Sequence, residues 1–282
     1  MREKAYAKLN LTLDVLGQRT DGYHELRMVM QTVELADEVA VELGGGAIRA
    51  HTDLGFLPND ERNLAVAAAL RFQEETGIPL GGFSVSIHKQ IPVCAGLAGG
   101  SSDGAAVLRA LNVLTGAKLT PLRLAEIGRR VGSDVPYCVL GGTALAEGRG
   151  ELLTPLPPLP PCPAVLCKPG WSVSTPELFA RADGVRLRRR PDTAGLLSAL
   201  KAGDLGGVAR RMYNVFEDVL PERRRAEIMD IKNALIQYGA LGAAMSGTGP
   251  TVFGLFADGE CARLAFNALQ ETYRETFLTH TM

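Results

Sequence analysis

The sequence has few features that would suit a nucleic-acid or membrane partner. Lys and Arg total 30 and Asp and Glu total 31 in 282 residues, so the net charge is −1. This balance gives no basic surface for nucleic acid or anionic lipid. No apolar run approaches the ~20 residues that span a bilayer, and the charged start MREKAYAKLN leads directly into a strand pattern rather than an apolar leader. We expect no nucleic-acid or membrane partner, and the oligomeric state stays open.

Cysteine and histidine are also sparse. The five cysteines form no C-x-x-C pair and have no metal-type spacing with histidine, and the four histidines lie far apart. An odd, scattered set of cysteines is typical of reduced thiols, so we expect a cytoplasmic location. The metal ligands, if any, stay unknown from these patterns.

The chain is long enough for one large domain or two ordinary ones, and its 46% hydrophobic content is that of a globular protein. Prolines crowd residues 154–161, where neither a helix nor a central strand can form, so this run is predicted to connect two domains, 1–155 and 162–282. Periodicity predicts strands over 5–15, 28–41, 83–89, 137–146 and 164–167, two short strands within 241–256, and helices over 63–76, 102–114, 120–131, 193–201, 205–217, 221–238 and 260–273, with another near 175.

The first strand has two distinct faces. Ala5, Ala7, Leu9 and the apolar residues that follow at every second position share one face. Lys8, Asn10 and Thr12 share the other, and a solvated face is the usual fate of such a row.

The most informative stretch runs from Ile91 to Leu114, where a turn rich in Gly and Ala leads into a helical repeat. Glycines let backbone N–H groups approach a ligand, and a helix N-terminus adds partial positive charge. This combination favours phosphate binding, with Ser101 or Ser102 capping the helix or touching a phosphate oxygen. The loop has neither the Gly-Lys-Ser/Thr of a Walker loop nor the spacing of a dinucleotide fingerprint, so a tight turn with a serine cap is the alternative.

Three further features complete a phosphoryl-transfer pattern: Lys8, the aspartate of Gly132-Ser-Asp-Val-Pro136, and a Ser246-Gly-Thr-Gly turn. Phosphoryl transfer needs held phosphates, a cation near the transferring group and a base for the acceptor hydroxyl. A glycine loop, Lys8 and Asp134 suit these three needs. For Asp134, a plain turn-forming role is the alternative.

These motifs resemble the galactokinase, homoserine kinase, mevalonate kinase and phosphomevalonate kinase superfamily, in Pro92-x-x-Ala-Gly-Leu-x-Gly-Gly-Ser-Ser102 and Ser246-Gly-Thr-Gly-Pro250. Three more stretches are similar to the branch that phosphorylates the 2-hydroxyl of 4-diphosphocytidyl-2-C-methyl-D-erythritol in non-mevalonate isoprenoid biosynthesis: Ala7-Lys-Leu-Asn-Leu11, Gly17-x-Arg-x-Asp-Gly-Tyr-His24 and Gly132-x-Asp-Val-Pro136. The resemblance covers nearly the whole chain. It implies an α+β fold with a ribosomal-protein-S5-like N-terminal half, a ferredoxin-like C-terminal half, and ATP bound in the cleft.

The resemblance also implies roles for individual residues. Asp134 matches the catalytic base and Lys8 its partner. Matches to ATP-binding positions are Asn63 and Lys89 near the adenine, and Pro92, Ala95, Gly96, Leu97, Ala98, Gly99, Gly100, Ser101 and Ser102 around the phosphates. Matches to substrate-binding positions are Asn10 and Thr175 for the erythritol, Tyr23 and Phe179 on either side of the cytosine, His24 at its edge, and Gly247 and Thr248. ATP and Mg²⁺ are the implied cofactors.

Two alternatives remain beside this interpretation. Another kinase of the superfamily, of the homoserine or mevalonate type, shares the loop motifs, but Gly22-Tyr-His24 with Phe179 suits a cytosine better than a small acceptor. A non-catalytic nucleotide- or RNA-binding module would fit an S5-like half, but near-neutral charge disfavours RNA. The chain departs from the family pattern at Cys94 and Ala98, where small residues or glycine are expected, and at Gly104.

Overall fold

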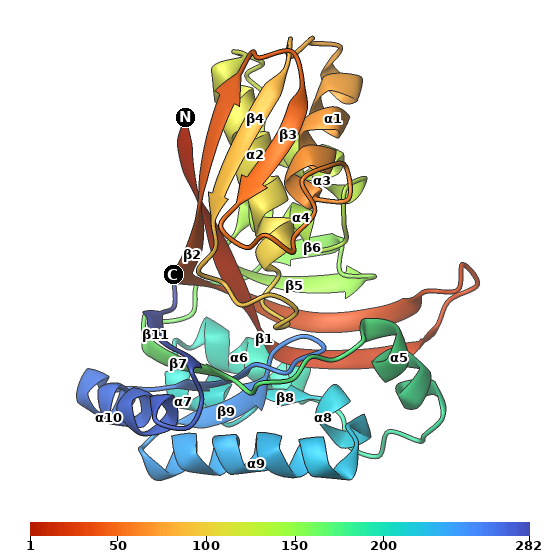
Figure 1. Cartoon of the computed structure of the whole chain (residues 1–282). Helices are drawn as coiled ribbons and strands as arrows, with labels where there is room; N and C mark the ends of the chain where they lie inside the picture. Colours follow the sequence, from red (N-terminus) through yellow and green to blue (C-terminus); the bar gives the residue numbers. More distant parts are fainter. The chain divides into compact units, whose positions relative to one another are not determined.

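The structure, a computed structural model, describes residues 1–282 and forms two compact units interleaved in sequence (Figure 1). The first unit contains residues 1–7, 35–93 and 98–141, and the second contains 8–34, 94–97 and 142–282. The long strands β1 (Arg2–Gln18) and β2 (His24–Leu43) contribute to both units. The predicted domain boundary at 155–162 lies inside the second unit, because β5 (Thr143–Gly148) pairs with β2 and β6 (Leu152–Pro155) pairs with β5.

The first unit is a sheet with helices packed on one face. Its strands run in the order β3 (Ile48–Thr52), β4 (Phe83–His88), β2, β1, with β3 parallel to β4 and β4 antiparallel to β2. The helices are α1 (Leu64–Thr76), α2 (Gly99–Leu114), α3 (Pro121–Arg129) and the short α4 (Val135–Leu140). Alternate apolar residues of the strands pack with small and branched residues of the helices, including Val41, Val85, Phe72, Val107 and Leu111. This single-sided covering explains the clean alternation in the strand sequences.

The second unit contains a four-stranded antiparallel sheet in the order β11 (Glu275–His280), β7 (Pro163–Lys168), β10 (Val252–Leu255), β9 (Gly242–Met245). Numbered along the chain, this order is 4-1-3-2, which is the ferredoxin-like arrangement. Helices α9 (Glu222–Gln237) and α10 (Gly259–Gln270) pack against these strands. The predicted ferredoxin-like C-terminal half is therefore confirmed.

The remaining elements of the second unit are short. They are α5 (Thr175–Asp183), α6 (Thr193–Lys201), α7 (Leu205–Ala209), β8 (Tyr213–Asn214) and α8 (Phe216–Val219). The two residues of β8 pair in parallel with Thr12 and Leu13 of β1. No helix of the protein is both long enough and apolar enough to cross a membrane.

Two predicted elements were wrong, and each has a local cause. The predicted strand at 137–146 divides into helix α4 and strand β5, because Pro136 lies in the first turn, where its fixed φ suits a helix, and Gly141 ends the helix with a φ of 68°. The predicted helix at 205–217 is broken into α7, β8 and α8, because the backbone at Asn214 pairs with β1. The latter is a tertiary contact that local periodicity does not report.

One buried threonine joins three segments of the second unit and offers a test of this packing. The Thr143 hydroxyl donates to Gln31 Oε1 at 2.6 Å and accepts from the Leu159 amide at 3.0 Å. Thr143→Val keeps the shape and leaves both partners unsatisfied, so we expect a loss of about 2–4 kcal/mol in unfolding free energy, given a cost of ~1–3 kcal/mol per buried unpaired group. Chemical denaturation measures this loss in unfolding free energy. Thr154→Val, at an exposed position of β6, is the matched control, and an equal loss in both variants would contradict the assignment.

Candidate active site

The polar face of β1 is buried rather than solvated. Lys8 is 4% exposed and Asn10 is 0% exposed, so the alternative of a solvated face does not hold for them. Lys8 Nζ donates to Asn10 Oδ1 at 2.6 Å. Burying an ammonium is costly unless polar partners replace the lost water. The hydrogen bond from Lys8 to Asn10 supplies part of that replacement.

The hydroxyl of Ser246 connects the β1 face to the glycine loop, which we define as Pro92–Ala98. Ser246 Oγ donates to the Gly96 carbonyl at 3.0 Å and accepts from the Asn10 amide at 3.2 Å. The Lys8 amide donates to the Leu97 carbonyl at 3.1 Å, beside these contacts. Three segments that are distant in sequence are thereby brought together, with Asn10 and Ser246 separated by 236 positions and Gly96 and Ser246 by 150.

The approach of loop and turn is close enough to require glycine. Gly96 has a φ of 76°, and a Cβ placed on it would lie 2.1 Å from the Ser246 carbonyl oxygen. Gly247 has a φ of 57°, and a Cβ there would lie 2.9 Å from the Gly96 oxygen. No side chain larger than hydrogen fits at Gly96 without moving the turn.

Asn214 is a site-building residue that the sequence analysis missed. Its Nδ2 donates to the carbonyls of Met245 at 2.8 Å and Gly247 at 2.7 Å, and its Oδ1 accepts from the Phe216 amide. These two hydrogen bonds therefore fix the position of the Ser246–Gly249 turn. A polar Asn inside an otherwise apolar stretch was the available signal, but the segment had been predicted as one helix.

Helix α2 begins at Gly99, and its first N–H groups are those of Gly99, Gly100 and Ser101, which have no intrahelical carbonyl to bond. Ala98 holds the N-cap position in the left-handed region, with a φ of 59° and no side-chain cap. The predicted serine cap was wrong, because Ser101 and Ser102 both lie within the helix rather than at its N-cap. The Ser102 hydroxyl donates to the Tyr6 carbonyl at 2.6 Å. The helix start therefore retains free backbone donors suited to an anion.

Asp134 lies in the first unit at the start of α4 and is half-buried. Its backbone carbonyl accepts from the Cys138 amide at 3.0 Å, and its side chain makes no cap. In this it differs from Asn63, Asp192 and Asp258, whose side chains cap α1, α6 and α10. Lys8 belongs to the second unit.

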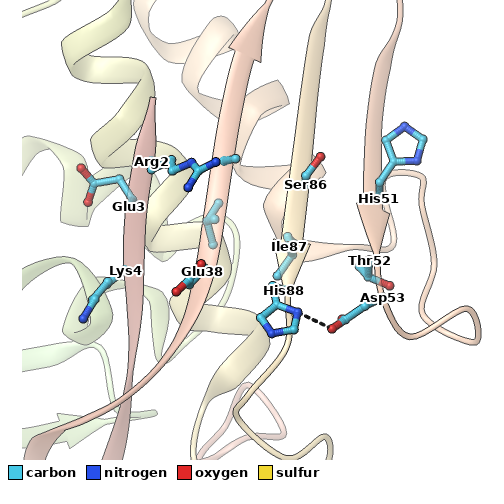
Figure 2. A pocket seen from close by; sticks show the side chains of 12 residues that line it. Arg2, Glu3, Lys4, Glu38, His51, Thr52, Asp53, Ser86, Ile87 and His88 are labelled. Carbon is cyan, nitrogen blue, oxygen red and sulfur yellow. Dashed lines mark ion pairs between the residues drawn. The ribbon is translucent and has the colours of Figure 1, made fainter.

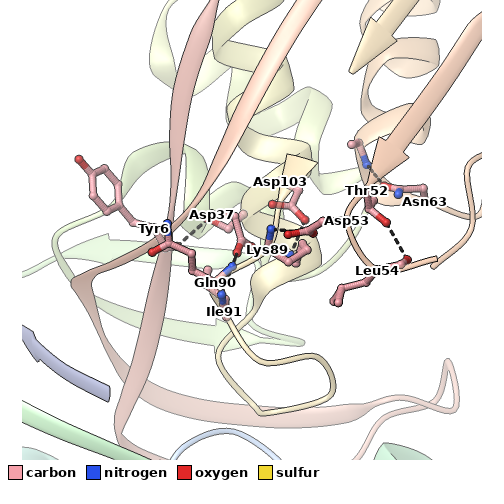
Figure 3. Close-up of polar contacts among 12 residues, drawn as sticks. Tyr6, Asp37, Thr52, Asp53, Leu54, Asn63, Lys89, Gln90, Ile91 and Asp103 are labelled. Atoms are coloured by element: carbon pink, nitrogen blue, oxygen red, sulfur yellow. Dashed lines mark hydrogen bonds and ion pairs between the residues drawn. The ribbon is translucent and has the colours of Figure 1, made fainter. Parts of the chain in front are cut away.

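The two residues predicted near the adenine use their polar atoms internally (Figure 3). Asn63 caps α1 by accepting from the Ala65 amide at 3.0 Å and also donates to the Pro58 carbonyl at 2.9 Å. The Lys89 side chain is 4% exposed and its Nζ lies 2.5 Å from Asp37 and 2.7 Å from Asp103. The Lys89 ammonium is thus enclosed by two carboxylates, which argues against direct contact with a nucleotide.

The aromatic residues predicted to hold a base have partners of their own. The His24 ring stacks on Phe179 with centroids 4.4 Å apart, and Phe179 also meets Phe216 edge-on at 5.0 Å. His24 Nε2 lies 2.8 Å from Asp183 Oδ1. An imidazole therefore lies over the Phe179 ring, where the sequence analysis expected a base.

Tyr23 is 54% exposed and lies under the guanidinium of Arg149, 4.4 Å from the ring centroid. The predicted substrate residues Thr175 and Thr248 come together, with their hydroxyl oxygens 3.1 Å apart. The structure thus joins α5 to the Ser246–Gly249 turn through these two threonines.

A separate depression of about 550 Å³ lies on the open face of the first-unit sheet (Figure 2). Most of its lining surface is apolar, although charged and polar residues such as Arg2, Glu38 and His51 contribute to it. His88 Nδ1 pairs with Asp53 at 2.7 Å within this lining. None of the predicted site residues lines it. No group of three or more His, Cys, Asp or Glu side chains comes together in a way that could hold a metal ion.

Comparison with known proteins reveals similarity along the whole chain. Residues 63–142 match the GHMP kinases N terminal domain and 196–275 match the GHMP kinases C terminal family. A 4-diphosphocytidyl-2-C-methyl-D-erythritol kinase from Alkaliphilus metalliredigens is 44% identical over 99% of this chain and 95% of its own. A crystal structure of a 4-(cytidine 5'-diphospho)-2C-methyl-D-erythritol kinase has a TM-score of 0.82 and 36% identity, covering 100% of this chain and 99% of that one.

A crystal structure of homoserine kinase from Cytophaga hutchinsonii is a more distant neighbour. Its TM-score is 0.74 with 23% identity, over 100% of this chain and 94% of that one. At this identity the likeness shows a common fold only.

The contact of Gly96 with the Ser246 turn gives a direct test of the site geometry. Gly96→Ala adds a Cβ where only 2.1 Å is available, so we expect a loss of roughly 3 kcal/mol or more in unfolding free energy. Gly116→Ala is the matched control: Gly116 also has a positive φ, of 66°, but open space around it, so only the conformational cost of about 1–2 kcal/mol applies. Equal losses in thermal or urea unfolding would show that no close approach exists at Gly96.

Proposed function

Because the chain belongs to the GHMP kinase superfamily and, within it, to the 4-diphosphocytidyl-2-C-methyl-D-erythritol kinases, we propose that it transfers the γ-phosphate of ATP to the 2-hydroxyl of 4-diphosphocytidyl-2-C-methyl-D-erythritol. The products are the 2-phosphate and ADP, within isoprenoid precursor biosynthesis. The similarity over 99% of the chain at 44% identity carries this proposal. The homoserine- and mevalonate-type alternatives are less well supported, because the homoserine kinase neighbour shares only the fold.

We propose that the α2 N-terminus and the glycine loop hold the phosphates of ATP. Unpaired backbone N–H groups and the positive end of a 16-residue helix favour an anion at Gly99–Ser101. Pro92, Ala95 and Leu97 are buried and support the loop through packing, and the carbonyls of Ala95 and Leu97 also accept backbone hydrogen bonds. The Ser102 hydroxyl contributes from within α2 by donating to the Tyr6 carbonyl.

In the proposed reaction, the acceptor hydroxyl oxygen attacks the γ-phosphorus, the bond from that phosphorus to the bridging oxygen of ADP breaks, and the hydroxyl proton passes to Asp134. Asp134 suits a base because a half-buried carboxylate can accept the hydroxyl proton. Lys8, held by Asn10 at 2.6 Å, offsets charge on the acceptor oxygen. Buried and preorganised, this ammonium stabilises developing charge without reorganisation at the moment of reaction.

We propose that the cytosine binds on Phe179 by displacing the His24 imidazole. The imidazole already stacks there at 4.4 Å, which shows that the Phe179 face accepts a flat ring. Displaced, His24 can present hydrogen-bonding atoms to the base edge, while Tyr23 covers the other face. Thr175, paired with Thr248, lies with Asn10 and Gly247 among the residues proposed for the erythritol and its phosphates.

Mg²⁺ accompanies ATP in kinases, where phosphate oxygens and water supply most ligands and the protein adds one or two carboxylates. Such binding does not need a cluster of three protein ligands, so the side chains present are compatible with it. When bound, Mg²⁺ would offset phosphate charge; we assign it no particular residue. The five cysteines are all free thiols, in keeping with the proposed cytoplasmic location.

The proposed activity is tested by ADP release from ATP and Mg²⁺ with three acceptors in parallel: 4-diphosphocytidyl-2-C-methyl-D-erythritol, homoserine and mevalonate. We expect turnover with the first only. Turnover confined to homoserine or mevalonate would sink the proposal and establish the alternative.

Asp134→Asn tests the proposed base. The variant keeps the size and polarity of the side chain but cannot take the hydroxyl proton, so we expect normal folding, unchanged ATP affinity and a fall in kcat of at least about 10²-fold. Asp258→Asn, at the N-cap of α10, is the matched control and should retain full activity. A kcat near the parent value in Asp134→Asn would remove this residue from the mechanism.

Phe179→Ala tests the proposed base platform. Loss of one base–aromatic stack costs ~1–3 kcal/mol, so we expect the KM for the cytidylyl acceptor to rise about tenfold or more while the KM for ATP stays constant. Phe56→Ala, at a residue 73% exposed, controls for loss of an aromatic ring in general. An unchanged acceptor KM would place the cytosine elsewhere.

A further inference from the structure

A buried cluster of three charged residues, Asp37, Lys89 and Asp103, lies at the base of the glycine loop (Figure 3). Asp37 comes from β2, Lys89 directly follows β4, and Asp103 lies in the first turns of α2. All three side chains are 5% exposed or less. Their burial and mutual contact indicate a role within the fold of the loop rather than at the protein surface.

The cluster fastens the chain just before the loop. Asp37 Oδ1 accepts from two successive backbone amides, Gln90 at 2.6 Å and Ile91 at 2.8 Å. Its other oxygen accepts from Lys89 Nζ at 2.5 Å. One carboxylate therefore fixes the backbone direction of the segment that leads into Pro92.

The same cluster fastens the chain just after the loop. Lys89 Nζ also donates to Asp103 Oδ2 at 2.7 Å, and a Cβ placed on Gly99 would lie 3.4 Å from Lys89 Nζ. The ammonium thus lies directly beneath the first residue of α2. The segment before the loop and the helix start after it are therefore both held by aspartates that bind the Lys89 ammonium.

The two carboxyl groups and the ammonium of the cluster shift each other's pKa. Burial raises the pKa of the Asp103 carboxyl to about 7, with the Lys89 charge opposing this and the Asp37 charge adding to it. Burial lowers the pKa of the Lys89 ammonium, but the charges of Asp103 and Asp37 outweigh burial and leave that pKa above its usual value. Asp103 Oδ1 is buried without a hydrogen-bond partner, so the contact of this carboxyl with Lys89 is made through Oδ2. An amide at position 103 would keep an oxygen that can accept from Lys89.

We propose that Asp37, Lys89 and Asp103 are positioning residues that set the spacing between the end of β4 and the start of α2, and through it the grip of the loop on ATP. The proposal rests on the function given above, since it takes the α2 start as the phosphate site. Lys89 then acts on ATP through the backbone rather than by touching the adenine. A misplacement of about 1 Å in such a frame can cost ~10²-fold.

The test measures ATP affinity by calorimetry without acceptor, and the KM for ATP, the KM for acceptor and kcat in the complete reaction. For Asp103→Ala we expect the ATP dissociation constant and KM to rise about 10- to 100-fold, with the acceptor KM within about twofold of the parent. Asp103→Asn should restore ATP affinity to within about threefold, because its amide oxygen still accepts from Lys89. If Asp103→Ala does not fold, Lys89→Gln, which keeps donors but not the charge, should show the same loss confined to ATP.

Lys168→Met is the matched control. Lys168 has a side chain 8% exposed and pairs with Glu275 at 2.5 Å, in the second unit. The Lys168→Met variant should have a lower melting temperature than the parent but the same ATP affinity. An ATP dissociation constant within twofold of the parent in folded Asp103→Ala, or an equal rise in both KM values, would overturn the positioning role. Because calorimetry uses ATP alone, the cluster is tested even if the parent protein fails to phosphorylate the proposed acceptor.

Discussion

The hydroxyl of Ser246 is the contact on which the second-unit part of the site depends. It donates to the Gly96 carbonyl and accepts from the Asn10 amide, at 3.0 and 3.2 Å. One buried hydroxyl therefore joins the turn that carries it to the glycine loop and to β1, which lie far apart in sequence. A hydroxyl can do this because it is donor and acceptor at once, and no apolar residue of similar size could leave both partners satisfied. The same contact also requires glycine at position 96, because a Cβ there would collide with the Ser246 carbonyl oxygen.

A second principle of the structure is that its buried ammonium groups have local polar partners. Lys8 donates a hydrogen bond to Asn10 on β1, and Lys89 forms ion pairs with Asp37 and Asp103 in the first unit. Isolated charges would be costly in such places. The proposed reaction needs positioning and electrostatic stabilisation rather than covalent chemistry, and charges held in fixed positions suit that need.

Local sequence patterns predicted much of the framework. The predicted helix over 63–76 agrees with α1, whose N-cap and C-cap are Asn63 and Gly77. The loop followed by a helix was correct, whereas its serine cap was not, since Ala98 adopts the left-handed N-cap conformation. The segment around Asn214 was missed for a different reason: its conformation is set by pairing with β1, over 200 residues away in sequence.

The sequence by itself determined the family, the α+β composition and the residue types of the proposed phosphoryl-transfer site. It could do so because glycine spacing, strand alternation and capping residues act over a few neighbouring positions. Only the tertiary structure decided the fate of individual polar groups. The row with Lys8 and Asn10 is buried rather than solvated, and the Lys89 ammonium is taken up by Asp37 and Asp103. Burial and pairing depend on segments that meet only after the chain has folded, and periodicity along one strand carries no information about what covers it.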